Sequence, residues 1–155
     1  MKRIAISLFA WMILLFTISC GGNKTDTPKP AGEKPKSMLA EEADPMKNKG
    51  IGPITELKLD PTIDQAMADK GKDIYEKMCS ACHKPTEKFI GPAPKGILDR
   101  RSPEWVMNMI LNPVEMVQKD PIAKKLLMEF NGSPMADQNL TGEEARAVLE
   151  YFRTL

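Results

Sequence analysis

The feature that most constrains this 155-residue chain is the run Cys79-Ser80-Ala81-Cys82-His83. It holds two of the three cysteines and the only histidine of the chain. At the end of a helix, two thiols three positions apart can bond to the two vinyl groups of one haem. The next residue then lies under the iron, and its imidazole is a good neutral nitrogen ligand. The run therefore favours a domain that closes around a single covalent haem c.

Three other uses of such a cysteine pair fit the rest of the sequence less well. A thioredoxin-type redox pair needs a βαβ context, and the chain has no convincing strand pattern. Half a zinc site needs a second Cys/His pair, whereas no cysteine follows Cys82. A structural disulfide would give no role to the adjacent histidine. We therefore interpret Cys79 and Cys82 as the haem attachment residues and His83 as an iron ligand.

The N-terminus is typical of an exported protein. Two basic residues precede an apolar run over residues 4–18, which is shorter than the roughly 20 residues of a membrane span. Residues 17–20 (Thr-Ile-Ser-Cys) resemble the lipobox of bacterial lipoproteins, with Thr where Leu is usual. We expect residues 1–19 to be a lipoprotein-type signal peptide and Cys20 to be acylated. An uncleaved signal anchor and ordinary cleavage nearby are the alternatives. All three place the protein on the periplasmic side of the cell envelope, and acylation anchors it to a membrane.

Residues 20–61 divide into the acylated cysteine, a tether and an arm. The segment from residue 21 to about Asn48 is polar, rich in Pro and Lys, and lacks apolar periodicity, so we expect a disordered, flexible tether. The first apolar residues that could pack on a domain follow as an extended arm: Ile51, Ile54, Leu57 and Leu59. The folded haem domain is expected over residues 62–155.

This domain is predicted to be all-α, with about four helices. Pro61 and Asp64 open the first helix, over about residues 63–79, and its expected apolar positions are Ala66, Ile74, Tyr75 and Met78. Thr141 and Glu144 form a capping box for the last helix. On that helix the expected apolar face comprises Ala145, Val148, Leu149 and Phe152.

Two further helices are predicted from their first residues. Ser102 followed by Pro103 opens one that stops near Asn112-Pro113. The pair Asp120-Pro121 opens the other in the same way, and that helix ends near residues 131–132. Charge adds little, because 22 Lys and Arg face 21 Asp and Glu. There is no basic excess of the kind that nucleic-acid binding demands.

The single histidine excludes a second histidine ligand, so the sixth position of the iron belongs to another residue or stays open. Met135 lies in an irregular segment before the last helix, from which a loop can direct a thioether at the iron opposite His83. Met116, in the loop expected between the two middle helices, is a weaker candidate. Core packing is the ordinary explanation for methionines within the expected helices: Met107, Met109 and Met128.

Over residues 62–155 the chain resembles the class I cytochrome c family, which implies a small helical fold around one haem. The pattern Gly71-x-x-x-Tyr75-x-x-x-Cys79 is similar to the first helix of that family. There the Gly lets the last helix approach and the aromatic ring packs across it. The resemblance implies that Tyr151 or Phe152 is the aromatic partner of Tyr75.

The resemblance also suggests what surrounds the haem. Gly91-Pro92 is similar to the turn whose Pro carbonyl accepts the proton on the far nitrogen of the ligand His, which assigns that role to Pro92. Haem propionates need donors, and Arg100, Arg101 and the indole of Trp105 are suitably placed. Three lysines near the motif form either a solvated face or a docking rim: Lys84, Lys88 and Lys95.

An iron with His and Met ligands has no open position for a substrate, which favours electron transfer over enzymatic chemistry. We expect a membrane-tethered carrier between a redox protein donor and a terminal respiratory oxidoreductase. The alternatives are a gas-binding or sensing haem protein with an open sixth site, and a fixed haem relay in a larger enzyme complex. Residues 104–113, with the acyl anchor, are similar to small cytochromes that accompany nitrous oxide reductase. That enzyme and a cytochrome oxidase are the expected acceptors.

Overall fold

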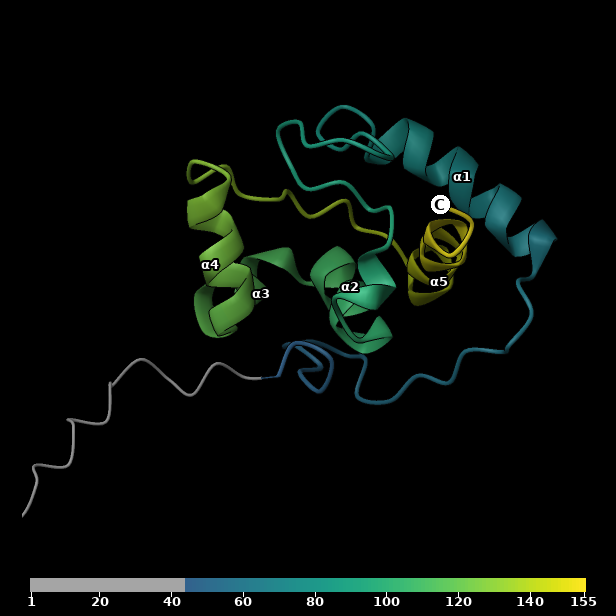
Figure 1. Cartoon of the computed structure of the whole chain (residues 1–155), viewed down its shortest axis with the longest axis horizontal. Helices are drawn as coiled ribbons and strands as arrows, with labels where there is room; N and C mark the ends of the chain where they lie inside the picture. Colours follow the sequence, from purple (N-terminus) through teal and green to yellow (C-terminus); the bar gives the residue numbers. More distant parts are fainter. Residues whose placement is uncertain (1–43) are drawn as a thin grey trace, which may run out of the picture. The chain divides into compact units, whose positions relative to one another are not determined.

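The computed structural model describes residues 44–155, and secondary structure within them is entirely helical (Figure 1). The elements are α1 (Gln65–Met78), the 3₁₀ helix η1 (Ile97–Asp99), α2 (Pro103–Leu111), α3 (Pro113–Lys119), α4 (Pro121–Glu129) and α5 (Gly142–Phe152). The predicted all-α class is confirmed, with one α-helix more than expected. The predicted signal peptide, Cys20 and residues 21–43 of the predicted tether lie outside the described residues. None of the described helices is long and apolar enough to cross a membrane.

The first and last helices, α1 and α5, pack directly on each other (Figure 1). Gly71 permits this approach, because a Cβ at that position would lie 1.9 Å from the carbonyl oxygen of Ala147. The ring centroid of Tyr75 lies 5.3 Å from that of Tyr151 and 5.8 Å from that of Phe152. The predicted pairing of Gly71 and Tyr75 with the last helix is thus confirmed, and both candidate aromatic partners take part.

Helix α1 begins after Asp64, whose side chain caps it. Its buried residues are Ala68, Gly71 and Tyr75, spaced three and four positions apart. The prediction that Ala66 belongs to the apolar face is wrong, because Ala66 lies outside this spacing and is exposed. The expected apolar face of α5 is correct: Ala145, Val148 and Leu149 are fully buried, and Phe152 packs against the core.

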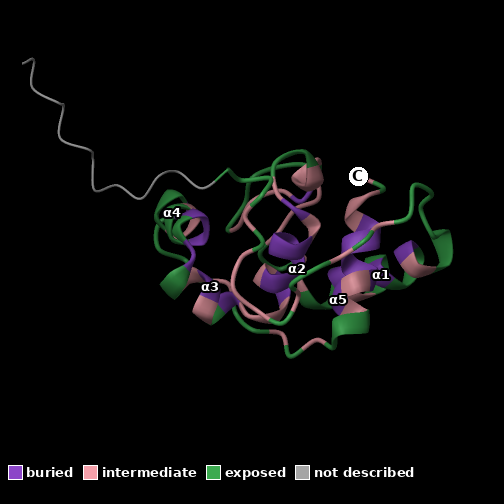
Figure 2. Cartoon of the chain, turned by 90° about the horizontal axis from the view of Figure 1, so that it is seen from below, coloured by how far each residue is buried: buried purple, intermediate pink, exposed green. Residues whose placement is uncertain are grey.

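Three helices begin where the sequence predicts. The Ser102 hydroxyl accepts a hydrogen bond from the Trp105 backbone N–H (3.2 Å) and caps α2. Asp120 caps α4 by accepting from the Ala123 N–H at 2.8 Å. The capping box at the start of α5 is formed as predicted. Figure 2 shows the buried residues gathered along α2, α5 and α1, which identifies these helices as the main walls of the core.

Helix α3 is the element that the sequence analysis misses. Residues after Pro113 are predicted to form a loop, whereas Pro113 stands at the first position of a helix, as Pro103 and Pro121 do in α2 and α4. Met116 is therefore helical and fully buried, and its sulfur lies 2.9 Å from the backbone nitrogen of Ile51. This contact gives Met116 a packing role under the N-terminal arm.

The three methionines that the sequence assigns to core packing differ in how far they are buried. Met107 is buried, as expected. Met128 is 71% exposed, so core packing is wrong for it; the buried residues of α4 are Ile122 and Ala123, near the start of that helix. Met109 is only half-buried, and it lines the cavity that forms the candidate site.

Residues 48–59 form an arm along α2 without regular secondary structure (the blue segment of Figure 1). The Asn108 amide, 1% exposed by residue, donates to the carbonyl oxygens of Lys49 and Ile54 at 2.8 Å and accepts from the Ile54 N–H at 2.9 Å. The Asn108 side chain thus satisfies backbone groups of the arm that would be paired with a neighbouring strand if the arm lay in a β-sheet. The predicted arm is confirmed, since all four of its apolar residues pack against the core. Asn48, where the predicted tether ends, also bonds to the domain, since its amide donates to Oδ2 of Asp120 at 2.6 Å.

Candidate haem site

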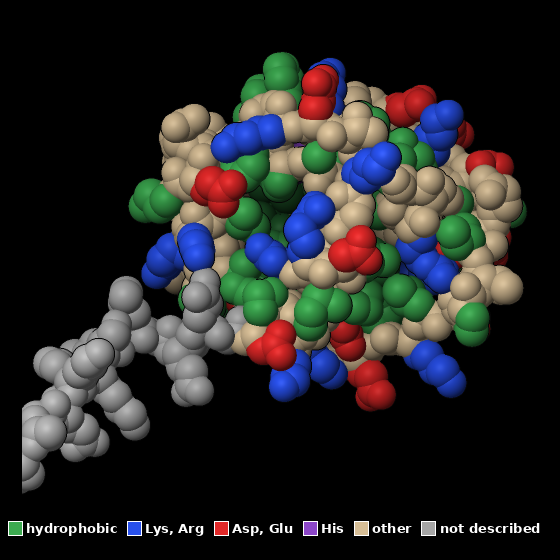
Figure 3. Space-filling model, in the orientation of Figure 1, with side chains coloured by type: hydrophobic (Ala, Val, Ile, Leu, Met, Phe, Trp, Pro, Cys, Tyr) green, Lys and Arg blue, Asp and Glu red, His purple; other side chains and the backbone are tan. Residues whose placement is uncertain are grey.

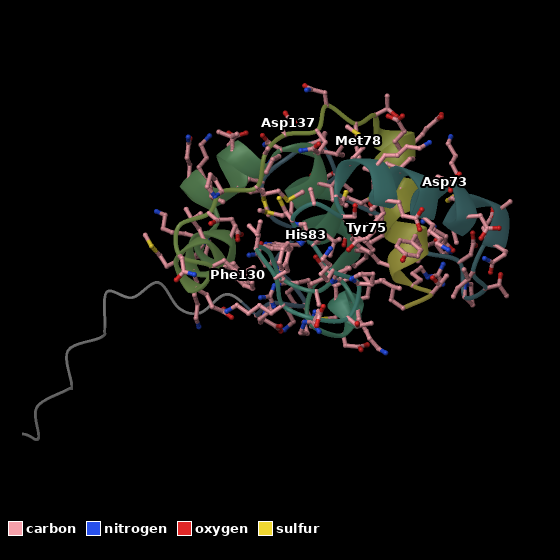
Figure 4. All side chains as sticks on the ribbon, turned by 90° about the horizontal axis from the view of Figure 1, so that it is seen from above. Asp73, Tyr75, Met78, His83, Phe130 and Asp137 are labelled. Atoms are coloured by element: carbon pink, nitrogen blue, oxygen red, sulfur yellow. The ribbon has the colours of Figure 1, made fainter. Side chains whose placement is uncertain are left out.

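A cavity of about 270 Å³ is lined by the Cys79–His83 segment, by Met135 and by mostly apolar side chains of α2, α4 and α5. The face in Figure 3 shows a hollow lined by hydrophobic side chains. Figure 4 shows His83 in the interior of the view, between Tyr75 and Phe130. An apolar cavity with few polar groups is the usual form of a cofactor site. Two thiols, an imidazole and a thioether on its wall fit a covalently bound haem.

The attachment residues lie on a turn that continues α1. The backbone N–H groups of Cys82 and His83 both donate to the Cys79 carbonyl oxygen, at 3.1 and 2.9 Å. Cys79 is half-buried, Cys82 is exposed, and both are free thiols that line the cavity. Burial, and then the neighbouring Cys82, raises the pKa of the Cys79 thiol. The sulfur of Cys79 is therefore a protonated thiol near neutral pH until it is attached.

The imidazole of His83 is held in one orientation. Its Nδ1 lies 2.8 Å from the Pro92 carbonyl oxygen, which is the hydrogen bond predicted from the sequence. Because a carbonyl can only accept, Nδ1 carries the proton and Nε2 keeps the lone pair that can bind iron. Gly91 supports the ring, since a Cβ there would lie 2.4 Å from Cε1 of His83. On the side of the cavity where His83 lies, here called the proximal side, the polypeptide alone thus fixes the orientation of the imidazole.

Tyr75 connects the motif to the α1–α5 contact. Its hydroxyl donates to the His83 carbonyl oxygen at 2.7 Å, and its residue is only 2% exposed. Burial, followed by the influence of Tyr151 and Cys79, raises the pKa of Tyr75 to about 12. The hydroxyl therefore keeps its proton, and with it this hydrogen bond, well into the alkaline range.

Met135 lines the cavity from the irregular segment between α4 and α5. It is half-buried and packs against the hydrophobic core. Met109 lines the same cavity from α2 and is the residue that sequence reasoning missed. A signal for it was available, because Met109 follows Trp105 by four positions and so shares its helix face. The site therefore contains three thioethers on its wall, from Met78 on α1, Met109 on α2 and Met135 on a loop.

Arg100, Arg101 and Trp105 all line the cavity, as expected for the surroundings of a haem. The Arg100 guanidinium donates to the carbonyl oxygens of Lys95 (3.0 Å) and Ala93 (3.2 Å), and these bonds hold the loop before η1. By contrast, Nε of Arg101 is buried and has no hydrogen-bond partner. An orphaned buried donor is costly, and an acidic group in the cavity would satisfy it. Arg101 thus fits a haem propionate.

The predicted role of Trp105 as a propionate donor is wrong in this structure. Its indole N–H donates to Oδ1 of Asp120 at 3.1 Å, and both residues are buried. An indole has a single N–H donor, so none remains for a propionate. Trp105 therefore contributes its ring to the cavity wall, while its polar atom faces a carboxylate that the sequence analysis did not consider.

Comparison with known proteins agrees with this geometry. The Cytochrome c family model matches residues 68–155, more than half of the chain. No curated protein matches it. Among solved structures, the cytochrome c of Rhodothermus marinus is 43% identical with a TM-score of 0.64, and the match covers 66% of this chain and 88% of that chain.

Two further structures extend this comparison. An engineered form of the Rhodothermus marinus cytochrome, bound to a carbene intermediate, is 42% identical with a TM-score of 0.61, covering 66% of this chain and 88% of that chain. The cytochrome c domain of a Pseudomonas putida protein is 28% identical with a TM-score of 0.51, covering 54% of this chain and 85% of that chain. Because the family model spans the segments that build the cavity, this chain belongs to the cytochrome c family, whose members bind haem c covalently and carry electrons.

Proposed function

We propose that this cytochrome is a membrane-tethered carrier that holds the haem iron between His83 and Met135 and delivers single electrons to a terminal respiratory oxidoreductase. The observation that carries the proposal is that both side chains line one cavity from different segments, with the imidazole already bonded to Pro92. A haem with His and Met ligands supplies one-electron transfer at a raised reduction potential. With His83 and Met135 both as ligands, the iron would have no open position for a substrate.

The side chains around the cavity have separate roles in this proposal. Cys79 and Cys82 attach the porphyrin, and His83 offers Nε2 to the iron because Pro92 holds the proton on Nδ1. Arg101 offers its unpartnered Nε to an acidic substituent. The apolar walls exclude water, which limits the reorganisation that accompanies a change of charge on the iron.

An optical spectrum tests whether Met135 is the sixth ligand of the iron. The ferric wild-type protein should show the weak near-infrared band of sulfur-to-iron charge transfer, and Met135→Ala should abolish it. Loss of the thioether should also lower the reduction potential and let added ligands bind the iron.

Two methionine variants serve as matched controls. Met109→Ala removes another thioether on the cavity wall, and Met116→Ala removes one that is buried under the arm. Both variants should keep the near-infrared band. If Met135→Ala keeps the band while Met109→Ala loses it, the wrong methionine has been assigned. A wild-type protein without the band would favour an open site and gas binding.

The membrane attachment rests on the sequence. Cys20 would carry the acyl chains, and more than one chain is needed for lasting attachment. Residues 21–43 would then act as a spacer that lets the haem domain turn between donor and acceptor. Cys20→Ala should move the cytochrome from the membrane to the soluble fraction or block its maturation.

The spacer has its own test. Scrambling residues 23–43 should leave respiratory electron flux nearly intact, whereas deleting most of them should slow it. Equal loss in the scrambled and the deleted proteins would mean that the segment is a specific binding element. That result would contradict a role in reach alone.

The acceptor is proposed to be nitrous oxide reductase or a cytochrome oxidase. Basic side chains near the attachment run suit a partner with acidic groups: Lys84 lies over the Phe89 ring and Lys88 over the Phe130 ring. Purified reduced protein should be oxidised fastest by its true acceptor, and the rate should fall as salt increases. A rate that does not depend on salt would exclude the lysines as a docking surface.

A further inference from the structure

Asp120 is a buried carboxylate whose hydrogen bonds go to neutral groups. It is 2% exposed, and it lies at the junction of α3 and α4. Its Oδ1 accepts from the Trp105 indole at 3.1 Å and from the Ala123 backbone N–H at 2.8 Å. Its Oδ2 accepts from the Asn48 amide at 2.6 Å. Helix capping explains one of these three contacts, and the other two tie α2 and the arm to the same carboxylate.

Through Trp105 this carboxylate reaches the wall of the cavity. Cζ of Arg101 lies 5.3 Å from the centroid of the Trp105 ring, so the guanidinium stacks on the indole that Asp120 holds. Burial and then Arg100 lower the pKa of Arg101, whereas Asp120 raises it, so the carboxylate supports the buried charge. Arg101 also donates to the Arg100 carbonyl oxygen at 2.6 Å. Its Nε is buried and lacks a partner, and Arg101 as a residue lines the cavity.

We propose that the buried charge of Asp120 sets the reduction potential of the haem iron, and that its hydrogen bond also fixes the Trp105 indole on which the Arg101 guanidinium rests. Asp120 itself does not line the cavity. The inference rests on the proposed electron-transfer function. A buried negative charge near the site favours the ferric over the ferrous state, because the ferric state carries one more positive charge.

The test is the reduction potential of the full-length holoprotein with Asp120→Asn. Asparagine keeps the shape but removes the charge, so the reduction equilibrium should shift toward the ferrous form by roughly three- to tenfold, as expected for one buried charge. The matched control is Glu150→Gln. Glu150 is 1% exposed and pairs with Arg146 and Arg153 on α5, away from the cavity lining. This control should lower the midpoint of thermal unfolding without moving the potential.

A double-variant cycle shows whether the charge of Asp120 acts directly on the iron. Arg101→Gln removes the guanidinium, and the shift caused by Asp120→Asn should persist in the Arg101→Gln background, because a Coulomb effect of the carboxylate does not require Arg101. Asn48→Ala leaves the carboxylate and its bond to Trp105 in place and should move the equilibrium less than twofold. An unchanged potential in Asp120→Asn, equal shifts in Asp120→Asn and Glu150→Gln, or loss of the shift in the Arg101→Gln background would overturn the proposal. Failure of Met135 as a ligand would appear in the wild-type spectrum and would leave this comparison of potentials intact.

Discussion

The two sides of the haem cavity are built in different ways. On the proximal side, the segment around His83 is tied by hydrogen bonds to itself and to α1. The N–H of Gly91 donates to the Cys82 carbonyl oxygen at 2.9 Å, and the ring of His83 and its carbonyl are fixed by Pro92 and Tyr75 respectively. The imidazole of His83 and its backbone carbonyl thus both have hydrogen-bond partners in the polypeptide.

On the distal side, where Met135 lies, the residues that follow Met135 form hydrogen bonds among themselves. The Asn139 N–H donates to Oδ1 of Asp137 at 2.8 Å, and the Gln138 amide donates to the Ala136 carbonyl oxygen at 3.2 Å. The segment that carries Met135 begins and ends at residues with positive φ: Asn131 (58°), Gly132 (72°) and Asn139 (54°). Its start is tied to α4, because the Asn131 and Gly132 N–H groups donate to the carbonyl oxygens of Met128 and Leu127 at 3.2 and 2.8 Å, and further along it is held by the packing of Met135 and Leu140 on the core.

The difference indicates which ligand the fold prepares in advance. Hydrogen bonds fix direction, whereas apolar packing is non-directional. His83 is therefore oriented by the polypeptide itself, while the position of Met135, the proposed sixth ligand, depends on packing. We expect ligand exchange and local opening to begin on the Met135 side.

The largest effect is expected from breaking the proximal side with Gly91→Ala. The new Cβ would lie 2.4 Å from the His83 ring, which cannot withdraw without losing its bond to Pro92. The free energy of unfolding should fall by about 2–3 kcal/mol, the upper range for overpacking. Chemical denaturation of the holoprotein measures it. Gly142→Ala is the matched control, because nothing lies within 4 Å of its Cβ, and it should stay within about 0.5 kcal/mol of wild type.

Hydrogen exchange compares the two sides directly. The amides of His83 and Gly91 donate within the proximal segment and should exchange on the order of a hundredfold more slowly than those of Met135 and Ala136. Two-dimensional NMR of the ferrous protein resolves these amides, and Leu149 in the core of α5 reports global unfolding. Similar rates on the two sides would remove the distinction drawn above.

Alkaline pH tests the contribution of Tyr75 to the proximal side. Folding raises its pKa from the ordinary 10.0 to about 12, so the unfolded chain loses the phenol proton first. This contribution to stability is complete below about pH 10 and is lost as the pH rises through 12. Tyr75→Phe should cost about 1 kcal/mol at neutral pH by removing a hydrogen bond, and should reduce the alkaline loss. Unfolding midpoints of the two proteins between pH 8 and 12 measure both effects. If Tyr75→Phe loses as much stability at alkaline pH as wild type does, a group other than Tyr75 causes that loss.

The smallest effect is expected from Asn139 at the end of the distal segment. Its φ of 54° is tolerated by Asn but costs other L-residues about 1 kcal/mol, so Asn139→Ala should lower the free energy of unfolding by that amount or less. Asn139→Gly should be close to neutral. Thermal unfolding compares the two variants. If Asn139→Ala lowered the free energy of unfolding more than Gly91→Ala does, the distal segment would be fixed more firmly than the proximal one.

Local signals predicted most of the fold. The residues Ser102, Asp120 and Thr141 each cap a helix because their short polar side chains bind the free N–H groups of the first turn, an interaction that spans three residues. Gly71 and Tyr75 were identified through the family resemblance, and the structure gives them the expected partners on α5. The attachment run and the bond from His83 to Pro92 also involve near neighbours in the sequence.

Long-range polar contacts could not be predicted in this way. Nothing near Asp120 in the sequence indicates that its carboxylate holds Trp105 and Asn48, because those partners lie 15 and 72 positions away. The same limit applies to Asn108, which bonds to the arm 54 positions earlier. Helix α3 is a different case. Pro113 was taken only as the end of the preceding helix, although proline is equally suited to the first position of the next.

The contact between Gly71 and Ala147 also affects the order of events in time. These residues are 76 positions apart, and closing a loop of that length costs on the order of 4 kcal/mol of chain entropy. At synthesis rates of about 5–20 residues per second, roughly 4–15 s separate the appearance of the two contact residues. Throughout that interval Cys79 and Cys82, which follow α1, have no α5 to close the domain over them. The separation of the first and last helices along the chain thus leaves both thiols uncovered by α5 until the last residues of the domain have been made.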